Sequence, residues 1–304
     1  MSLTIASVNV NGIRAATKIR NENNPGMLAW LTETPADVVL MQEVRATVDQ
    51  ARAALAPALE QGWNLEVAPA EAPGAKGRAG VGILSRTPLD DVTFGIPTFE
   101  DAGRFIAATL HDGTRVGSLY LPSGSAGTAK QDEKYRFLDE FEALLERWAD
   151  EYPNMVIGGD WNICHRREDL KNWKTNNKKS GFLPHERAFM DAIFGCFPDD
   201  EPQDAELKAD PVWAGAVEYG AEGRREANGD PKWFDVARRL QPEDASFTWW
   251  TFRGQAFNNN AGWRIDVQAA TANMLERAER TWVDKAPTVE QRWSDHSPLV
   301  VEYR

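Results

Sequence analysis

Six apolar stretches of the sequence are each followed directly by polar residues that can bind a cation or carry a proton. They end, in chain order, at Asn9, Glu43, Tyr120, Asp160 with Asn162, Asp266, and Asp295 with His296. Carboxylate and amide oxygens suit Mg²⁺ or Mn²⁺, and a histidine beside acids can hold a proton or stabilise a charged phosphate oxygen. The six ends predict a common rim, where strand ends converge and phosphate chemistry could take place.

Residues 158–162, with the sequence Gly-Gly-Asp-Trp-Asn, follow the apolar run at 155–157. Asp160 and Asn162 are two apart and point to the same side of an extended chain, whereas Trp161 points the other way and is expected in the core. Taken alone, the stretch is either a turn capped by an Asx side chain or a site for a metal, a water or a phosphate.

Two other kinds of catalytic site are poorly supported. Only one histidine, His296, lies at the predicted rim, and Cys164 and Cys196 have no metal-ligand spacing, so a zinc site is not favoured. A serine nucleophile is not favoured either, because the sequence has no Gly-x-Ser-x-Gly motif and Ser297 precedes a proline.

The composition is that of a folded, soluble protein. The chain has 304 residues, 42% of them hydrophobic and 26% charged, which is typical of a globular domain. No apolar run reaches the ~20 residues that span a bilayer, and two cysteines form no disulfide framework, so a reducing cytoplasm is expected. The net charge of −12 has the wrong sign for binding polyanions, so any such site must be a local exception.

Apolar runs bounded by turn residues predict about a dozen strands and few helices. The predicted strands are at 3–9, 37–43, 64–68, 79–85, 91–96, 104–110, 115–121, 155–157, 246–252, 263–270 and around 298–301. The predicted helices are at 47–61, 130–151 and 233–240, with two more beginning at Asn24-Pro25 and near Pro184. With so few helices between them, the strands cannot all be joined by parallel crossovers. Two sheets packed face to face, with helices on the outer faces, would bury them.

Charge is unevenly spread along the second half of the chain. Residues 165–187 contain seven Lys or Arg and three acids, a balance of +4, whereas residues 198–231 contain ten acids and three bases, a balance of −7. The acidic segment is rich in Gly, Pro and Ala and is interpreted as an insertion within a single domain of residues 1–304.

Six motifs contain the candidate site residues. They are Ser-Val-Asn-Val-Asn-Gly-Ile-Arg-Ala at 7–15, Leu-Met-Gln-Glu-Val at 40–44, Tyr-Leu-Pro-Ser-Gly at 120–124, Gly-Asp-Trp-Asn at 159–162, Trp-Arg-Ile-Asp at 263–266 and Ser-Asp-His at 294–296. In this order they resemble the motifs of the exonuclease III / AP endonuclease family, which belongs to the wider endonuclease–exonuclease–phosphatase fold. The match spans the chain apart from the acidic segment. The resemblance implies a four-layer αββα sandwich and a divalent-metal phosphodiesterase acting on damaged DNA.

The resemblance also implies a metal site. Glu43 looks like the principal ligand of Mg²⁺ or Mn²⁺, and no organic cofactor is expected. The other candidate ligands at matched positions are Asn9, Asp160, Asn162, Asp295 and His296.

The catalytic roles carry over in the same way. Asp160 is similar to the residue that orients or deprotonates the attacking water, and Asn162 would hold a phosphate oxygen. His296 would contact the scissile phosphate, oriented by Asp266. Tyr120 would hydrogen-bond near the phosphate or the leaving group.

Two further features look like contacts to DNA. The motifs Asp-Leu-Lys-Asn-Trp-Lys at 169–174 and Lys-Lys-Ser-Gly-Phe at 178–182 resemble the DNA-contacting loop of the DNA-repair members. Contacts to the DNA backbone are expected from Lys171, Lys174, Asn176 and Lys178, and further substrate contacts from Asn11 and Arg14. Trp249, Trp263 and Ile265 look like the wall of a pocket for a flipped-out abasic sugar, which would exclude an intact nucleotide by size. Trp250 could belong to that pocket or to the core.

The resemblance has two departures. The acidic segment at 198–231 is not part of the family core; it is either a solvated surface elaboration or a segment that repels DNA outside the cleft or binds a partner. Residues 124–130 do not align with the family's basic loop, so no DNA contact is assigned there.

The expected activity is Mg²⁺-dependent cleavage on the 5′ side of abasic sites, leaving a 3′-hydroxyl, with 3′→5′ exonuclease activity. The expected substrate is double-stranded DNA with abasic sites or 3′ ends. The protein is expected to be a cytoplasmic monomer, associated with the nucleoid when bound and not with a membrane. The alternatives are an enzyme that is mainly a DNA exonuclease, a non-catalytic DNA-binding protein, and a lipid or inositol phosphatase. The loop at 171–182 argues against the phosphatase.

Overall fold

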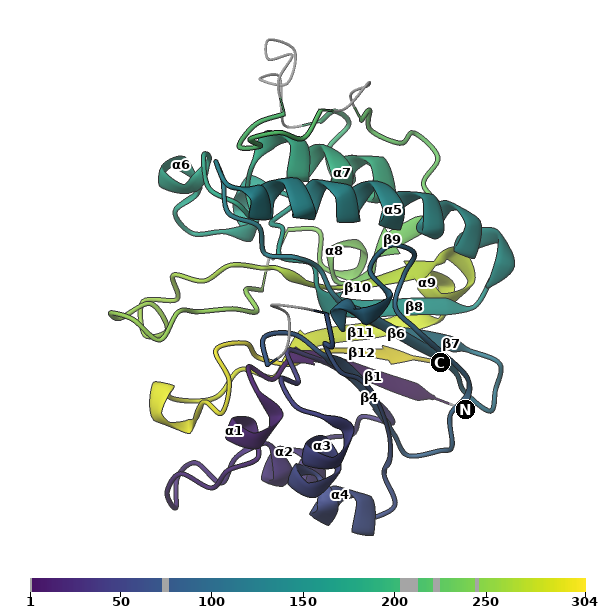
Figure 1. The fold of residues 1–304 in the computed structure, drawn as a ribbon, viewed down its shortest axis with the longest axis vertical. Coiled ribbons are helices and arrows are strands. Elements are labelled where there is room, and N and C mark those ends of the chain that lie inside the picture. Colours follow the sequence, from purple (N-terminus) through teal and green to yellow (C-terminus); the bar gives the residue numbers. More distant parts are fainter. Residues whose placement is uncertain (1, 73–76, 203–212, 221–224, 244–245) are drawn as a thin grey trace.

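Two six-stranded mixed sheets pack face to face, and helices cover their outer surfaces (Figure 1). The computed structural model describes residues 2–72, 77–202, 213–220, 225–243 and 246–304. This arrangement is the expected four-layer αββα sandwich, so the predicted fold class is confirmed. Among the helices described, none is long and apolar enough to cross a bilayer.

The first sheet contains both chain termini. Its strands, in spatial order, are β11 (Ala278–Val283), β12 (Leu299–Tyr303), β1 (Leu3–Asn9), β2 (Val38–Gln42), β4 (Val81–Ser85) and β3 (Asn64–Ala68). Only the β1–β2 pair is parallel, with Asn9 opposite Gln42 at the carboxyl ends. Two strand ends that carry candidate site residues therefore lie side by side.

The second sheet repeats this plan. Its strands, in spatial order, are β5 (Asp90–Phe94), β6 (Phe105–Thr109), β7 (Arg115–Tyr120), β8 (Met155–Asp160), β10 (Asp266–Thr271) and β9 (Trp233–Asp235). Its single parallel pair, β7–β8, again brings two carboxyl ends together.

The helices divide between the two outer faces. The first sheet is covered by α1 (Ile13–Ala16), α2 (Met27–Glu33), α3 (Val48–Ala54) and α4 (Ala56–Glu60), and the second by α5 (Ala129–Glu151) and α7 (Pro184–Phe194). The other short elements are η1 (Glu100–Ala102), η2 (Arg167–Asp169), α6 (Trp173–Asn176), α8 (Val236–Leu240), α9 (Ala272–Arg277) and η4 (Val289–Gln291). Of these, α8 and α9 pack beside β9 and β10.

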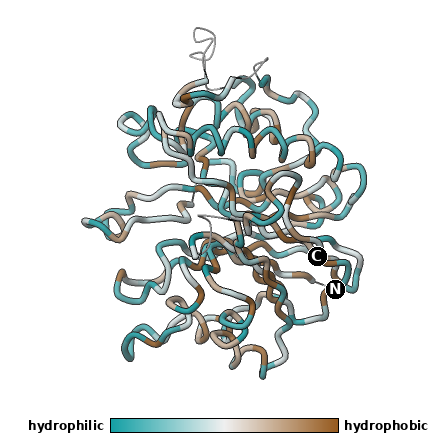
Figure 2. Tube along the Cα trace, viewed as in Figure 1, coloured by the Kyte–Doolittle hydropathy of each residue, from teal (hydrophilic) through white to brown (hydrophobic). Residues whose placement is uncertain are grey.

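Strand alternation separates the apolar residues into three layers. Figure 2 shows that hydrophobic positions are concentrated along the central strands. On β1, Ile5 faces the layer between the sheets, whereas Val8 faces the helices of its own sheet. On β8, Val156 joins the middle layer and Ile157 faces α5. Trp161 is fully buried against α5, as alternation predicted.

Several element boundaries differ from the predictions. The helix predicted at 47–61 is two helices, because Pro57 lacks the N–H that a continuous helix needs. The segment predicted as a helix at 233–240 begins as strand β9, which pairs with β10 before α8 starts. The strand predicted at 263–270 begins only at Asp266, and the one predicted at 246–252 forms only isolated bridges through Trp249.

The helix predicted to begin at Asn24-Pro25 starts at Met27, after Gly26 in a left-handed conformation. The buried amide of Asn24 instead donates to the carbonyl oxygens of Glu290 (2.8 Å) and Arg292 (2.9 Å). It therefore ties the loop before α2 to the loop that precedes β12.

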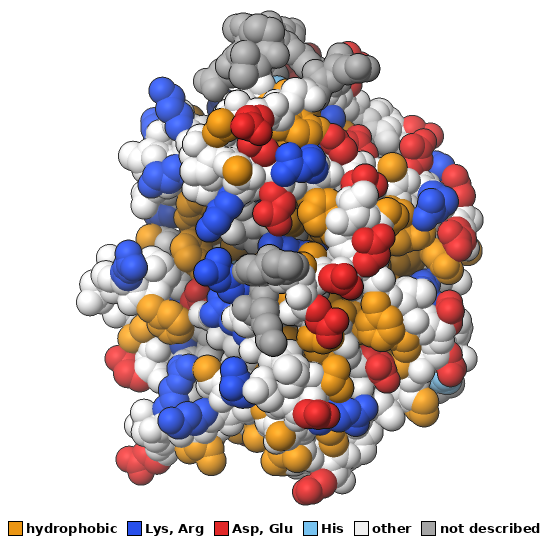
Figure 3. All heavy atoms as spheres, viewed as in Figure 1, with side chains coloured by type: hydrophobic (Ala, Val, Ile, Leu, Met, Phe, Trp, Pro, Cys, Tyr) orange, Lys and Arg blue, Asp and Glu red, His pale blue; other side chains and the backbone are white. Residues whose placement is uncertain are grey.

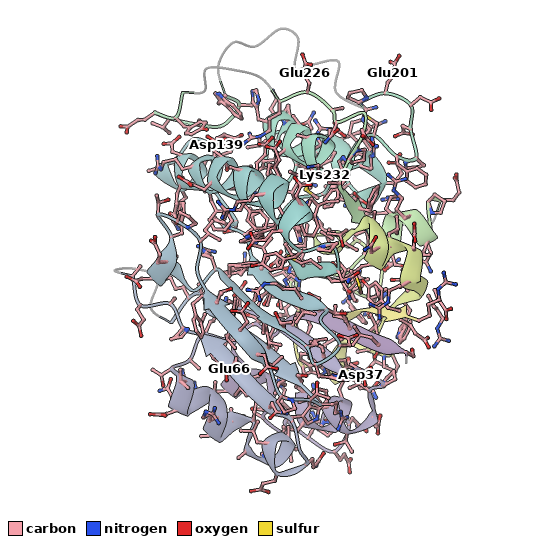
Figure 4. All side chains as sticks on the ribbon, turned by 90° about the vertical axis from the view of Figure 1, so that its right-hand side faces the viewer. Asp37, Glu66, Asp139, Glu201, Glu226 and Lys232 are labelled. Carbon is pink, nitrogen blue, oxygen red and sulfur yellow. The ribbon has the colours of Figure 1, made fainter. Side chains whose placement is uncertain are left out.

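Residues 213–219 of the acidic insertion pack onto α5. Trp213 is buried, with its ring centroid 5.1 Å from that of Tyr135. The Asp132 carboxylate accepts a hydrogen bond from the backbone N–H of Val217 (2.9 Å). Figure 4 shows Glu226 at the top of the molecule, beyond α5. The interpretation as a solvated elaboration is therefore wrong for the part around Trp213, which is core.

We expect Phe141→Ala to lower the free energy of unfolding by about 3–5 kcal/mol, because it empties a fully buried position of α5. The Phe141 ring contacts those of Phe105 and Trp161, with centroids 6.1 Å and 5.8 Å away. Urea denaturation measures the loss. The control, Phe94→Ala, removes a ring that is 52% exposed and should cost less than about 0.5 kcal/mol. Equal losses in the two variants would contradict this description of the core.

Candidate active site

Three polar side chains stand in one row at the end of the second sheet. Tyr120 pairs with Asp160 across the parallel β7–β8 contact, and Asp160 pairs with Asp266 across the antiparallel β8–β10 contact. Residues directly opposite one another on neighbouring strands point to the same face of a sheet. The strand register therefore brings together three residues that are 40 to 146 positions apart in sequence.

The facing sheet contributes Asn9 at the end of β1 and Glu43 just after β2. The side-chain amide nitrogen of Asn9 donates to Glu43 Oε1 and to Asp160 Oδ2, both at 2.9 Å. Its carbonyl oxygen accepts from the backbone N–H of Asn11 at 2.9 Å. One buried amide therefore joins the two sheets at the rim and holds two carboxylates apart.

His296 lies between two buried acids. Its Nδ1 is 2.8 Å from Asp266 Oδ2, and its Nε2 is 3.8 Å from Asp160 Oδ2. Burial opposes the imidazolium, but the carboxylates of Asp266, Asp160 and Asp295 outweigh it and raise the pKa of His296 to about 10. The histidine is therefore protonated near neutral pH and can donate a hydrogen bond to an anion.

Asp160 is buried, and its environment favours the protonated form. Burial, opposed by the charge of His296 and reinforced by Asp266, raises the pKa of Asp160 to about 7. Its Oδ1 accepts from the backbone N–H of Asn162 at 3.0 Å. A carboxylate whose pKa is close to neutral is well matched to accept a proton from water.

Tyr120 remains a neutral phenol. Burial and the carboxylates of Glu43 and Asp160 raise its pKa well above its ordinary value. The guanidinium of Arg104 lies over its ring, 4.8 Å from the centroid. The hydroxyl group is therefore available as a hydrogen-bond donor at the rim.

Asp295 is held by neutral donors. Its Oδ1 accepts from Asn11 Nδ2 at 2.8 Å, and its Oδ2 accepts from Trp249 Nε1 at 3.1 Å. Its backbone carbonyl accepts from Arg292 (2.8 Å) and from the N–H of Trp250 (3.0 Å). Hydrogen bonds to both carboxylate oxygens and to the backbone carbonyl therefore fix the orientation of Asp295.

Four rim residues adopt a left-handed backbone conformation that residues other than glycine rarely take. They are Asn11 (φ 48°), Glu43 (φ 50°), Arg45 (φ 50°) and Asn162 (φ 52°). Such conformations cost about 1–3 kcal/mol each and persist where the surrounding contacts hold them in place. Of the seven residues other than glycine that have a positive φ in the described chain, four therefore lie at this one edge.

The donors present at the rim fit a hard divalent cation. The described structure places the ligand atoms of Asp160, Asp266 and His296 within 4.8 Å of one another, but a protonated histidine cannot bind a metal. Glu43 and Asp295 are partly exposed oxygen donors on either side of Asn9 and Asn11. They suit Mg²⁺ or Mn²⁺, which prefer oxygen ligands and keep several waters.

Comparison with known proteins agrees with this geometry. The model of the endonuclease/exonuclease/phosphatase family matches residues 6–296. The chain belongs to this family.

Named relatives make the resemblance more specific. An exodeoxyribonuclease of Bacillus subtilis is 27% identical over 303 residues, covering 98% of both chains. A DNA-(apurinic or apyrimidinic site) endonuclease of Dictyostelium discoideum is 24% identical, covering 98% of this chain and 70% of the relative. The 3′ phosphatase NExo from Neisseria, solved with a product DNA hairpin, has a TM-score of 0.75 at 25% identity, with 99% of each chain covered. The predicted resemblance to exonuclease III and AP endonucleases is confirmed.

The predicted DNA-contacting loop projects beside the rim of this family member. Lys171, Lys174 and Lys178 are exposed, whereas the Asn176 amide is turned inward and donates to the Asn172 carbonyl at 2.8 Å. Asn176 is therefore a loop-shaping residue as the structure places it. In Figure 3, lysine and arginine side chains gather on the left, the side of α6 and α1, and acidic side chains are more numerous on the right.

Asn11 and Arg14 are the two remaining predicted substrate contacts. The Asn11 amide donates to Asp295 (2.8 Å), whereas Arg14 lies on α1, which covers the first sheet. Arg14 is exposed and lines, with Arg45, a cavity of about 550 Å³ between α1 and α3.

The residues predicted as a sugar pocket meet beside Asp295. The rings of Trp249 and Trp263 contact edge to face, with centroids 5.9 Å apart and an interplanar angle of 84°. Both tryptophans are partly exposed, whereas Ile265 is buried beneath them. Trp250 is buried against Phe257 and belongs to the core.

Lys134 supports the site and was missed in the sequence. It is fully buried in α5, where its ammonium group lies 2.7 Å from Glu186 Oε1 and donates to the Asn162 carbonyl at 3.0 Å. Glu186 also accepts from the backbone N–H of Gly181 (2.7 Å) and of Leu183 (2.9 Å). This ion pair joins the loop after β8 to the loop before α7.

A signal for Lys134 exists in the sequence. It lies four residues before Leu138 and seven before Phe141, on the apolar stripe of the predicted helix. A lysine on such a stripe indicates a buried charge that must have a partner. The left-handed (αL) backbone at Glu43 and Arg45 could not be predicted in this way, because neither glutamate nor arginine favours that conformation.

We expect Asp266→Asn to lower the pKa of His296 by about one to three pH units, because an acceptor and a negative charge 2.8 Å away are lost together. In the metal-free wild type, the imidazolium should persist up to a pKa of about 10. Titration of the ring ¹⁵N signals by NMR measures both values. Exposed His111 provides a second signal that the substitution should not change, and an unchanged His296 titration would show that Asp266 does not hold this proton.

Proposed function

We propose that this family member is a DNA-repair phosphodiesterase that cleaves double-stranded DNA on the 5′ side of abasic sites and leaves a 3′-hydroxyl. We also infer 3′→5′ exonuclease activity. The observation that carries the proposal is the rim itself. In support, Asp160 with a near-neutral pKa, the protonated His296 and the oxygen donors Glu43 and Asp295 occur together with exposed lysines and a partly exposed pair of tryptophans. The names of the relatives support it.

The residues present can perform the hydrolysis. Asp160, with its carboxylate poised near neutral pH, accepts the proton of the attacking water. The Asn162 amide nitrogen donates to the Leu121 carbonyl (2.8 Å), which leaves one N–H for a phosphate oxygen. This N–H and the Nε2–H of His296 hold non-bridging phosphate oxygens, with His296 kept protonated and oriented by Asp266. The phenol of Tyr120 donates to the phosphate or to the leaving oxygen. Preorganised donors of this kind stabilise the charge of a pentavalent phosphate.

Glu43 and Asp295 are the residues that would hold the cation, with Asn9 and Asn11 fixing their orientations. Mg²⁺ or Mn²⁺ bound there would act as a Lewis acid on the phosphate and its leaving oxygen. The other predicted ligands are less suited to this task. Asp160 and Asn162 have the roles above, His296 carries a proton, and the Asn9 amide nitrogen faces Glu43 and Asp160.

Selectivity for abasic sites would come from the pocket formed by Trp249, Trp263 and Ile265. A deoxyribose without its base is small and apolar enough to contact the two indole rings, whereas an intact nucleotide is too large. The exposed lysines at 171, 174 and 178 would contact backbone phosphates without reading sequence. Together these features fit DNA damage better than a lipid headgroup.

The second candidate is an enzyme that is mainly a 3′ exonuclease or 3′ phosphatase with weak abasic cleavage. The similarity to the 3′ phosphatase NExo over 99% of both chains favours it. The same catalytic residues would serve both activities, and only the fit of the pocket to an internal abasic site would differ. In both cases we propose a single-domain, cytoplasmic monomer of residues 1–304.

One assay separates the candidates. An end-labelled duplex with a single internal tetrahydrofuran residue, incubated with the protein and Mg²⁺, should give one product cut 5′ of the analogue. EDTA should abolish the reaction. A ladder from the 3′ end without incision would support the second candidate, and no reaction with Mg²⁺ or Mn²⁺ would rule out both.

We expect Asp160→Asn to lower the rate of incision by about 10²–10⁴-fold, because the general base is removed, while the affinity for abasic duplex changes little. Single-turnover kinetics and fluorescence anisotropy measure the two quantities. The unfolding midpoint in urea checks that the variant is folded. A loss of binding in a folded variant would mean that Asp160 shapes the site rather than handling the water.

A further inference from the structure

One side chain belongs both to the Trp249–Trp263 pair, proposed above as the wall of an aromatic pocket, and to the rim of acids. The indole Nε1 of Trp249 donates to Asp295 Oδ2 at 3.1 Å, while its ring packs edge to face against Trp263. The backbone of Trp249 forms bridges to Trp263 on one side and to His296 on the other. The residue thus sits between the pocket and the two C-terminal site residues.

Asp295 depends on this contact for its orientation. Its two carboxylate oxygens each accept from a neutral side chain, Oδ1 from Asn11 (2.8 Å) and Oδ2 from Trp249 (3.1 Å). A carboxylate oxygen has a second lone-pair site, so a donor on each oxygen fixes the plane of the group and leaves lone pairs for a cation. Without the indole N–H, the carboxylate could rotate about its χ2 angle, which has a broad energy well.

Groups that hydrogen-bond to metal ligands alter metal affinity although they never touch the metal. Their removal typically weakens binding about 10–100-fold. Trp249 is in this position if Asp295 is a ligand, and it is also the wall against which a sugar would pack. A sugar that presses on the ring would change the freedom of the same N–H that holds Asp295.

We propose that Trp249 is a positioning residue that couples the aromatic pocket to the divalent-cation site. Its indole N–H holds Asp295 in the orientation that faces the cation, and filling of the pocket strengthens cation binding through this contact. The proposal rests on the proposed function in taking Asp295 as a ligand. By linkage, the cation must strengthen binding of pocket-filling DNA by the same factor.

The first test measures Mn²⁺ alone, without DNA or turnover. We expect Trp249→Phe, which keeps an aromatic ring but loses the donor, to weaken Mn²⁺ binding to the metal-free protein about 10–100-fold. Electron paramagnetic resonance of free Mn²⁺ gives the dissociation constant. The matched control is Trp263→Phe, which changes the neighbouring tryptophan of the same pair. The side-chain donors to Asp295 described above, Asn11 and Trp249, are both kept in this variant. It should bind Mn²⁺ like the wild type.

Trp249→His keeps a ring N–H and provides a second test that does not depend on the phenylalanine variant being folded. Its Mn²⁺ affinity should lie closer to that of the wild type than to that of Asp295→Asn. An affinity as weak as that of Asp295→Asn would overturn the proposal. So would wild-type affinity in a folded Trp249→Phe variant, or equal weakening in the two Trp→Phe variants.

The coupling is tested by titrating Mn²⁺, without Ca²⁺, into protein saturated with a duplex that carries a tetrahydrofuran residue. The Asp160→Asn background is used to prevent cleavage of the duplex. Mn²⁺ affinity should rise on addition of this duplex, and Trp249→Phe in the same background should reduce the rise. An equal rise in both proteins would remove the coupling. If the wild type binds no Mn²⁺ and cuts no DNA, the proposed function fails; if it does both and only the Trp249 results differ from expectation, this inference alone fails.

Discussion

The amide group of Asn9 is the contact on which the rim depends. Its nitrogen donates to Glu43 from the same sheet and to Asp160 from the facing sheet, both at 2.9 Å. The carboxylates of Glu43 and Asp160, which both accept from this one amide, would repel each other where little water screens their charges. The N–H donors between them satisfy one oxygen of each, and they also fix how far apart the two sheets stand at this edge. The position of Asp266 is then set by that of Asp160, because the two residues pair directly between β10 and β8.

Four acids converge on one edge of a protein that already carries a net charge of −12. His296, protonated between Asp266 and Asp160, and Arg45, paired with Glu43, offset part of this charge. The remaining excess is what a divalent cation neutralises, so the site favours a metal before it favours a phosphate. The approach of a polyanion then depends on basic side chains near the rim. In Figure 3, lysine and arginine side chains are more numerous on the left of the molecule than on the right.

Part of the site could be read from the sequence, because β1, β2, β7 and β8 are apolar runs that end at, or one residue before, a distinctive polar residue. Asp266 instead begins β10, and Asp295 and His296 lie in the loop before β12, so the expected strand ends were wrong for these three residues. Asp160 and Tyr120 fall where that pattern placed them. The predictions failed where tertiary contacts override the structure that the local sequence favours. Residues 233–235 have helical character but complete the edge of the second sheet beside β10. Trp249 lies in a strand-like run, yet it forms only bridges, because its segment is held between Trp263 and His296.

The contacts among side chains were out of reach for a different reason. Lys134 and Glu186 are 52 residues apart in sequence, and nothing in a single chain shows which buried lysine meets which acid. A similar network lies under the loop that was predicted to contact DNA. There, Arg264 donates to Asp235 at 2.6 Å and its backbone N–H donates to the Asp169 carbonyl at 2.7 Å. Burial opposes ionisation of Asp235, but the charge of Arg264 outweighs it and lowers the pKa of this acid.

Buried ion pairs of this kind contribute little net stability, because the cost of removing two charges from water offsets their attraction. Their value lies in geometry. Apolar side chains of similar volume could fill the same space, but they would not hold backbone carbonyls such as that of Asn162 in place. The two networks lie directly behind the αL turn at Asn162 and the loop that carries the exposed lysines. We infer that charge is buried there to keep strained and irregular backbone in one arrangement, so that the catalytic side chains meet their substrate already oriented.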